Sequence, residues 1–372
     1  MLALGIEDGR VVLVNEATGE EEWAAHAHPN SGRIKVAMSP DFRLVASVGL
    51  FDKTWKLWNA TSGAVHREGA KHDGTGACIC RKVRHGLRIL LEGCSIEGHT
   101  GGLRAVAFSP CGGGIATAGL DGAVIVWDAR TGKEKRRMQG DEEGASFGAA
   151  WSLCFSVDGA WLACGNAVGS IQIWNAMTGA FLRTIPLAPK QNSVVSVLFS
   201  PTESRSLAAW EEDDQIHLWD IVSGEKIRSI AGGAFAAFSP DGRTIATASA
   251  TKGSDVQFVD AKCGELLRTL KLPRPLRLTM DVQDASVCSG AFSADGSKFA
   301  SATYDGTCHV WDSLFGVLIR TIDVGIAVHS LAWGRDGEQE THGAMAVAVE
   351  NTRYSWKGRA SRLTRGWSDL QK

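Results

Sequence analysis

Three stretches of this chain decide its fold: Val124–Gly132 reads VIVWDARTG, Ile171–Gly179 reads IQIWNAMTG and Ile216–Gly224 reads IHLWDIVSG. Each is an apolar run that ends in Trp followed by Asp or Asn, with a Gly four residues further on. Four more copies, two of them with Val in place of Trp, end at Gly19, Gly63, Gly264 and Gly316. Neighbouring copies end 40 to 52 residues apart, except for one interval of 69 residues. The chain is therefore a repeat protein.

A second pattern lies upstream of the motif, where an apolar run ends in a turn, as in AAFSPDG (236–242) and SGAFSADG (289–296). Asp-Gly between two such runs predicts a hairpin, because both residues tolerate the positive φ that a primed turn requires. A third turn, Asp121-Gly122 or Asp305-Gly306, precedes the Trp run. Three hairpin turns join four short strands. Most neighbouring motif copies are separated by close to the roughly 40–45 residues of a propeller blade.

With these motifs the chain resembles the WD-repeat β-propellers, from Leu2 to about Val349. One repeat also matches that family's hydrogen-bond relay, and the resemblance implies that it runs from Trp127 through Thr117 and His99 to Asp121. We interpret these residues as structural, because an indole N–H, a hydroxyl and an imidazole each need a partner when withdrawn from water. The other repeats lack parts of the relay.

Both ends of the chain carry strand patterns that complete each other. The chain opens on LALGIE, RVVLVN and EEWAAH without a first strand, whereas AVHSLAWG (327–334) resembles a first strand without its blade. We therefore expect an all-β, seven-bladed WD-repeat propeller in which N- and C-terminal strands share one blade, since closure removes exposed sheet edges. The alternative is a truncated eight-bladed propeller, because AMAVAVE (344–350) would compete with LALGIE for the same place.

The long interval predicts an insertion at 69–97 within a single propeller domain over residues 1–352. Removing this segment shortens the interval to 40 residues and joins Glu68 to Gly98 in an ordinary blade junction. The insertion holds Cys78, Cys80, His85 and Cys94. Structural zinc usually needs two pairs of ligands with short spacing, which this set does not provide. We therefore expect no metal, and interpret the segment as a solvated loop or an unspliced intron in the gene model.

Composition indicates an intracellular protein. The formal net charge is −2, which disfavours nucleic acid or a membrane surface as a general partner. Nine cysteines form no framework, and an odd number predicts reduced thiols and a cytoplasmic or nuclear location. We find neither an apolar run of membrane-spanning length nor a leader pattern at Met1.

Residues 353–372 form a basic tail that holds five Arg or Lys residues before Asp369, with Trp356 and Trp367 among them. Such a tail could bind RNA, whereas the simpler interpretation is a solvated terminus. The tail supports one alternative function, an RNA-associated assembly factor.

The sequence shows no positive sign of catalysis. It lacks the Gly-x-Ser-x-Gly elbow, the His-Glu-x-x-His motif and the phosphate loop. The acidic run Glu211–Asp214 occupies a predicted turn, where adjacent carboxylates usually mark a solvated surface. We therefore expect no enzyme activity, no catalytic residues and no cofactor.

The resemblance implies where partners bind. In WD-repeat proteins the residue before the turn Asp points to the narrow top face of the disc. Carried over to this chain, the binding residues are Glu7, Phe51, Leu120, Asp213, Ser254 and Tyr304. Large apolar side chains on an exposed rim are the types that anchor interfaces. We expect a noncatalytic scaffold that assembles a multiprotein complex, itself a monomer within that complex, with partners that the sequence does not identify.

A second alternative rests on Trp127-Asp128-Ala129-Arg130. This tetrapeptide is similar to the Trp-Asp-x-Arg signature of WD-repeat substrate receptors of cullin-RING ubiquitin ligases. The resemblance implies that Arg130 would contact the ligase adaptor.

Overall fold

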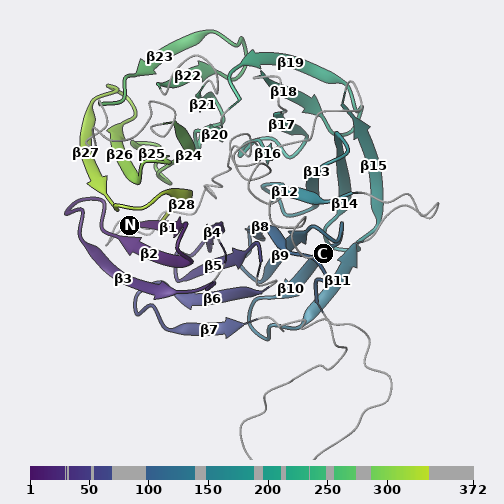
Figure 1. Cartoon of the computed structure of the whole chain (residues 1–372). Helices are drawn as coiled ribbons and strands as arrows, with labels where there is room; N and C mark the ends of the chain where they lie inside the picture. Colours follow the sequence, from purple (N-terminus) through teal and green to yellow (C-terminus); the bar gives the residue numbers. More distant parts are fainter. Residues whose placement is uncertain are drawn as a thin grey trace, which may run out of the picture.

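The computed structural model describes residues 1–29, 31, 33–51, 54–68, 98–138, 148–187, 196–210, 215–233, 235–248, 255–273 and 286–334. Their strands form seven four-stranded antiparallel sheets, which stand around a central axis as the blades of a disc (Figure 1). The predicted seven-bladed all-β propeller is confirmed. The insertion at 69–97, the segment 344–350 and the tail at 353–372 lie outside the described residues.

In every blade the four strands follow one another from the centre of the disc outward. Blade 1 consists of β28 (Val328–Trp333), β1 (Leu2–Ile6), β2 (Arg10–Val14) and β3 (Glu21–His26). Blade 2 consists of β4 (Ile34–Met38), β5 (Leu44–Gly49), β6 (Trp55–Asn59) and β7 (Val65–Glu68). Blade 3 consists of β8 (Leu103–Phe108), β9 (Gly114–Gly119), β10 (Val124–Asp128) and β11 (Glu134–Met138). Blade 4 consists of β12 (Ala150–Phe155), β13 (Trp161–Asn166), β14 (Ser170–Asn175) and β15 (Phe181–Pro186).

The remaining three blades have the same order. Blade 5 consists of β16 (Ser196–Phe199), β17 (Ser206–Trp210), β18 (Gln215–Asp220) and β19 (Lys226–Ala231). Blade 6 consists of β20 (Ala236–Phe238), β21 (Thr244–Ala248), β22 (Val256–Asp260) and β23 (Leu266–Leu270). Blade 7 consists of β24 (Val287–Phe292), β25 (Lys298–Thr303), β26 (Thr307–Asp312) and β27 (Leu318–Asp323).

The two ends of the chain meet in blade 1. Strand β28 pairs antiparallel with β1, and Leu331 lies opposite Leu4 in the register. The prediction that N- and C-terminal strands share one blade is confirmed, because three N-terminal strands and one late strand form a single sheet. Figure 1 shows β28 beside β1 at the point where the ring closes.

The core consists of seven apolar clusters, one between each pair of neighbouring blades. Both faces of a blade are covered in this way, so inner strands such as β9 and β24 are buried along their whole length. These strands consist of small, apolar and uncharged polar residues and contain no charged side chain, as expected of a sheet buried on two sides. The outermost strands instead face solvent, and β7 is exposed throughout.

The residues of the repeated Trp-Asp/Asn-x-x-x-Gly motif form the turn between the third and fourth strands of each blade. The Asp128 carboxylate accepts hydrogen bonds from the backbone N–H groups of Arg130, at 3.0 Å, and Thr131, at 2.7 Å. Asn175 and Asp220 accept the corresponding pair in their own turns. Gly132 closes the turn with a φ of 72°, a left-handed conformation that favours glycine. The motif therefore links the third strand of each blade to the outermost strand.

In six of the seven blades an arginine four residues after the motif Gly contacts the next blade, and in blade 1 a tryptophan takes this place. Arg228 donates to the carbonyl oxygen of Cys263 at 2.9 Å, and Arg320 donates to that of Thr18 at 3.0 Å. The corresponding donors in the other blades are Arg67 to Arg130, Arg136 to Thr178, Arg268 to Phe315 and, through an indole, Trp23 to Ala60. In blade 4, Arg183 lies against Gly224. We call this ring of contacts the outer latch.

The closing strand provides a direct test of the fold. Leu331 is fully buried in the cluster between blades 7 and 1. We expect Leu331→Ala to lower the free energy of unfolding by about 2–5 kcal/mol, because it removes buried methyl groups and leaves a cavity. Urea denaturation measures this change. The control Val65→Ala, at an exposed site of β7, should change the free energy by less than about 0.5 kcal/mol. Equal effects of the two substitutions would contradict the assignment of β28 as the closing strand.

Candidate protein-binding surface

The top face is the end of the disc that carries the turns between the second and third strands of the blades. Four of the six predicted binding residues lie in these turns: Glu7, Phe51, Leu120 and Tyr304. Asp213 and Ser254 lie outside the described residues.

Phe51 and Leu120 lie on neighbouring blades, 2 and 3, and both are exposed, by 63% and 43% respectively. The segment that enters β8 joins their turns. The backbone N–H of Leu120 donates to the carbonyl oxygen of Gly102 at 2.8 Å. On its other side Gly102 packs so closely on blade 2 that a Cβ there would lie 1.9 Å from the carbonyl oxygen of Leu50. Only glycine permits this approach, which brings the two apolar turns side by side.

Val168 on blade 4 extends this surface, and sequence reasoning missed it. Its side chain is 52% exposed. A Cβ at Gly122 would lie 2.8 Å from the carbonyl oxygen of Gly148, and one at Gly148 would lie 2.9 Å from Cγ1 of Val168. The turns of blades 3 and 4 are therefore in contact through Gly148. We name Phe51, Leu120 and Val168 the top arc. A signal existed in the sequence, because Val168-Gly169 stands where other blades have Asp-Gly.

Tyr304 lies on blade 7, and Glu7 lies on blade 1, the blade that closes the ring. Tyr304 is half-buried, packs against the cluster between blades 7 and 1, and places its ring edge-on to His329 with centroids 5.7 Å apart. The closing strand β28 supplies this histidine, and its contact withdraws part of the tyrosine ring from solvent. Glu7 is exposed, and its backbone N–H donates to the carbonyl oxygen of Ala327 at 3.1 Å.

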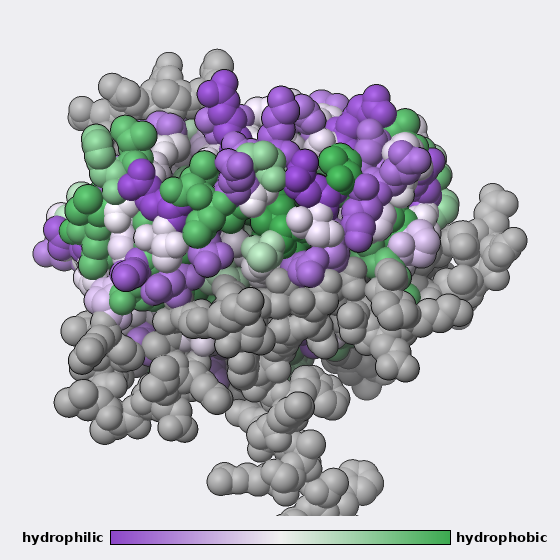
Figure 2. Space-filling view, turned by 90° about the horizontal axis from the view of Figure 1, so that it is seen from above, coloured by the Kyte–Doolittle hydropathy of each residue, from purple (hydrophilic) through white to green (hydrophobic). Residues whose placement is uncertain are grey.

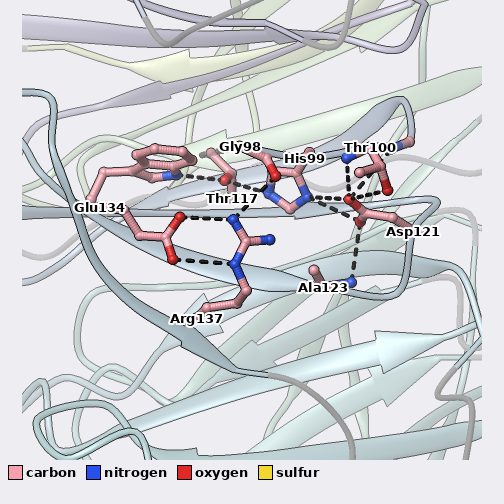
Figure 3. A network of polar contacts seen from close by, with 10 residues as sticks. Gly98, His99, Thr100, Thr117, Asp121, Ala123, Glu134 and Arg137 are labelled. Carbon is pink, nitrogen blue, oxygen red and sulfur yellow. Dashed lines mark hydrogen bonds and ion pairs between the residues drawn. The ribbon is translucent and has the colours of Figure 1, made fainter. Parts of the chain in front are cut away.

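The four predicted relay residues lie in a chain of hydrogen bonds, of which Figure 3 labels His99, Thr117 and Asp121. Trp127 Nε1 donates to Thr117 Oγ1 at 2.7 Å, and Thr117 Oγ1 lies 2.8 Å from His99 Nε2. His99 Nδ1 lies 3.0 Å from Asp121 Oδ1. Asp121 in turn accepts the backbone N–H of Thr100 at 2.7 Å. These bonds join the entry to β8, strands β9 and β10, and the turn that presents Leu120.

A second relay beneath Phe51 was not recognised in the sequence. Trp58 Nε1 donates to Ser47 Oγ at 2.9 Å, and Ser47 Oγ lies 2.8 Å from His28 Nε2. Thr54 Oγ1 lies 3.3 Å from the other ring nitrogen of His28. The signal was His28 ahead of β4, in the same place as His99 ahead of β8. The turns that carry Phe51 and Leu120 are thus both held by buried histidines.

Asp121 is the carboxylate of this relay, and its surroundings shift its pKa. Burial by itself would raise its pKa, but hydrogen bonds from His99 and from the backbone of Ala123 and Thr100 outweigh burial and lower the pKa to about 2. The carboxylate therefore stays ionised at neutral pH and accepts every N–H that points at it. These hydrogen bonds stabilise the turn.

Other chemistry-bearing residues do not assemble into a site within the described part of the chain. There we find no group of three side chains arranged to hold a metal ion, and the six described cysteines are free thiols. Burial raises the pKa of Cys164 and of Cys308 to about 12, which makes these thiols inert. The acidic run 211–214 and the cysteines of the insertion lie outside the described residues. The described chain also contains no helix long and apolar enough to cross a membrane.

Most exposed large apolar side chains lie on the outer wall, away from the top face. They belong to the outermost strands and to the motif turns of blades 4 to 7: Met177, Phe181, Leu182, Val222, Ile227, Leu266, Leu267, Leu314, Phe315, Val317, Leu318 and Ile319. Figure 2 views the disc from the side that carries β19 and β23, and shows hydrophobic side chains among hydrophilic ones along this wall. We name it the apolar wall. A surface this rich in apolar groups is typical of protein contacts.

Comparison with known families agrees with the geometry. The family described as "WD domain, G-beta repeat" matches residues 276–312, and the family described as "Vps8 beta-propeller" matches residues 104–215.

Several curated proteins are similar over a large part of the chain. The guanine nucleotide-binding protein subunit beta of Oryza sativa subsp. indica is 26% identical over 222 residues, which cover 59% of this chain and 57% of that protein. The subunit of Zea mays is 25% identical over 233 residues, 60% of this chain and 58% of that protein. The Arabidopsis thaliana subunit is 26% identical over 243 residues, 62% and 61% of the two chains. The chain thus spans less than two thirds of the length of these relatives.

The relay predicts a specific dependence of stability on pH. Because folding lowers the pKa of Asp121 from 3.8 to about 2, the ionised carboxylate stabilises the fold above pH 4. This contribution, about 2 kcal/mol, should be lost as the pH falls from about 4 to about 2. We expect Asp121→Asn to be less stable than the native chain at pH 7, with a difference that shrinks on acidification. Urea denaturation at a series of pH values measures this, and a difference independent of pH would contradict the role of the charge.

Proposed function

We propose that this chain, which belongs to the WD40-repeat β-propeller family, is a noncatalytic scaffold that assembles a multiprotein complex through its top face. WD40 propellers usually mediate protein interactions and are generally noncatalytic. The observation that carries the proposal is the top arc, where Phe51, Leu120 and Val168 stand exposed on three successive blades.

The top arc has the features of an interface anchor. Exposed apolar side chains that are held rigidly lose little conformational freedom on binding, so more of their burial contributes to affinity. Two of the three turns rest on buried relays, through His28 and His99. An aromatic and an aliphatic side chain on such turns are suited to fill pockets of a partner protein.

The position of the apolar wall supports a scaffold and not a single-partner binder. The wall belongs to the outermost strands and motif turns of blades 4 to 7, whereas the top arc belongs to the inner turns of blades 2 to 4. Partners on the two surfaces would approach from different directions. We infer that the chain holds at least two proteins at once, as a single copy in the complex, in the cytoplasm or the nucleus.

One observation favours a second candidate function, that of a substrate receptor of a cullin-RING ubiquitin ligase. Arg130, the residue of the Trp-Asp-x-Arg signature, is exposed in the motif turn of blade 3. Its backbone is held by Asp128 and by Arg67, and its guanidinium makes no hydrogen bond or ion pair within the described residues. The guanidinium is therefore presented to solvent on an ordered turn, as adaptor binding would require.

The top face is tested with the triple variant Phe51→Ala, Leu120→Ala, Val168→Ala. We expect tagged protein with these changes to lose the partners that the native chain captures from its own cells, because each substitution removes an exposed apolar anchor. Quantitative mass spectrometry measures the recovered proteins. The matched control Phe315→Ala, Leu318→Ala, Val317→Ala removes the same three residue types from the apolar wall and should keep the top-face partners. Full recovery with the top-face variant would refute the proposal.

The receptor function is tested with Arg130→Ala. We expect this variant to recover at least about tenfold less of a cullin-RING adaptor in pull-down, since an interfacial arginine often contributes about 2 kcal/mol or more. The control Arg43→Ala changes another exposed arginine, in the turn between β4 and β5, and should recover as much adaptor as the native chain. If the native chain recovers no adaptor, the receptor function is wrong and the scaffold proposal is unaffected.

A further inference from the structure

The outer wall of blade 3 is strongly basic. Strand β11 and the turn before it carry Arg130, Lys133, Lys135, Arg136 and Arg137. Blade 2 adds Lys56 and Arg67 at the adjoining edge. The whole chain has a net charge of −2, so this density of cations is a local feature. We name it the basic wall.

Every carboxylate on the basic wall is already engaged. Glu134 lies 2.7 Å from Arg137, Asp128 lies 3.0 Å from Lys135, and Glu68 lies 3.5 Å from Lys56. Three of the seven cations are thereby neutralised. The four that have no carboxylate partner within the described residues are Arg67, Arg130, Lys133 and Arg136.

Two of the uncompensated cations are held in place by neutral groups. Arg67 Nε donates to the carbonyl oxygen of Arg130 at 3.2 Å, and its Cδ lies beside Gly132. Arg136 Nη1 donates to the carbonyl oxygen of Thr178 at 3.4 Å. A carbonyl fixes the direction of a guanidinium without cancelling its charge. These two latch arginines therefore add uncompensated positive charge to this wall.

Protection of an exposed sheet edge does not account for this cluster. Edge strands often carry a lysine or arginine that prevents pairing with other chains. Strands β15, β23 and β27 occupy the same outermost position, yet each contains one arginine and no other cation. The basic wall also draws on a second blade and on the motif turn, which are not part of the β11 edge.

From this charge we infer that the basic wall binds an acidic segment of a partner protein, which lies in an extended form along β11 and the motif turn of blade 3. Arginine guanidinium groups pair with carboxylates through two parallel hydrogen bonds, and Arg130 has its whole fork available. Nucleic acid is a poorer fit, because non-specific binding of single strands relies on aromatic rings for stacking, and the basic wall exposes no Trp, Tyr or Phe in the described residues. This surface is separate from the top arc.

The test measures binding of a short fluorescein-labelled polyglutamate peptide to the full chain by fluorescence anisotropy. We expect Arg130→Glu, Lys133→Glu to weaken binding by about tenfold, because each substitution replaces an attraction with a repulsion. Neither side chain makes a hydrogen bond or ion pair within the described residues, so the variant should remain folded. Higher salt should weaken binding of the native chain.

The matched control is Lys226→Glu, Lys262→Glu, which changes the net charge equally at exposed sites on blades 5 and 6. It should bind the peptide as the native chain does. Equal weakening by the control, or equal binding of a polyglutamine peptide, would overturn the inference.

Two further measurements distinguish an acidic partner segment from two other ligands of the basic wall, a nucleic acid and a second copy of this chain. Tighter binding of a single-stranded oligonucleotide than of the peptide would reassign the wall to nucleic acid. Self-association in light scattering that the wall variant abolishes would reassign it to a second copy, whose blade 1 exposes Glu20, Glu21 and Glu22. The triple variant of the top arc should bind the peptide normally, so failure of this inference leaves the scaffold proposal intact.

Discussion

Ring closure is the constraint on which the rest of this structure depends. Each blade has two apolar faces, and both can be buried only when every blade has a neighbour on each side. The seven clusters between blades meet this need, and the last of them forms because β28 adds to β1. Without that pairing, blades 1 and 7 would each expose a face lined by residues such as Leu4 and Cys308.

Two turns of the top arc are tied to this closed core by hydrogen bonds. The relay from Trp127 to Asp121 reaches from a buried indole to the turn beneath Leu120, and the relay through His28 does the same for Phe51. A structural network thereby positions apolar side chains for binding. Because the turns and outermost strands differ from blade to blade, a ring of similar repeats presents different chemistry around its circumference. The top arc lies on blades 2 to 4, the apolar wall on blades 4 to 7 and the basic wall on blades 2 and 3.

Sequence reasoning recovered the repeat, and with it the fold, because each blade is built from local hairpins whose turn residues recur at fixed spacing. Sequence reasoning predicted fewer of the residues of the candidate surface. Val168 was missed because the expectation took the residue before a turn Asp, and blade 4 has Val168 where that Asp would stand. The outer latch was also missed, although six of the seven motif glycines are followed four residues later by arginine. A pattern search by itself does not reveal that this arginine reaches the neighbouring blade.

The sequence by itself determined the repeat and the propeller fold, because both depend on motifs that recur at regular spacing. It favoured seven blades closed by residues 327–334 over a truncated eight-bladed ring, and the relay of blade 3 followed from the resemblance to WD-repeat propellers. Only the tertiary structure decided which surface residues are neighbours. Phe51 and Leu120 are far apart in the chain, and their turns lie side by side because Gly102 permits the close approach of blades 2 and 3. Tyr304 shows the opposite effect, because His329 from the closing strand covers part of its ring. Such contacts depend on how sheets pack face to face, and that packing is a property of the ring and not of any single repeat.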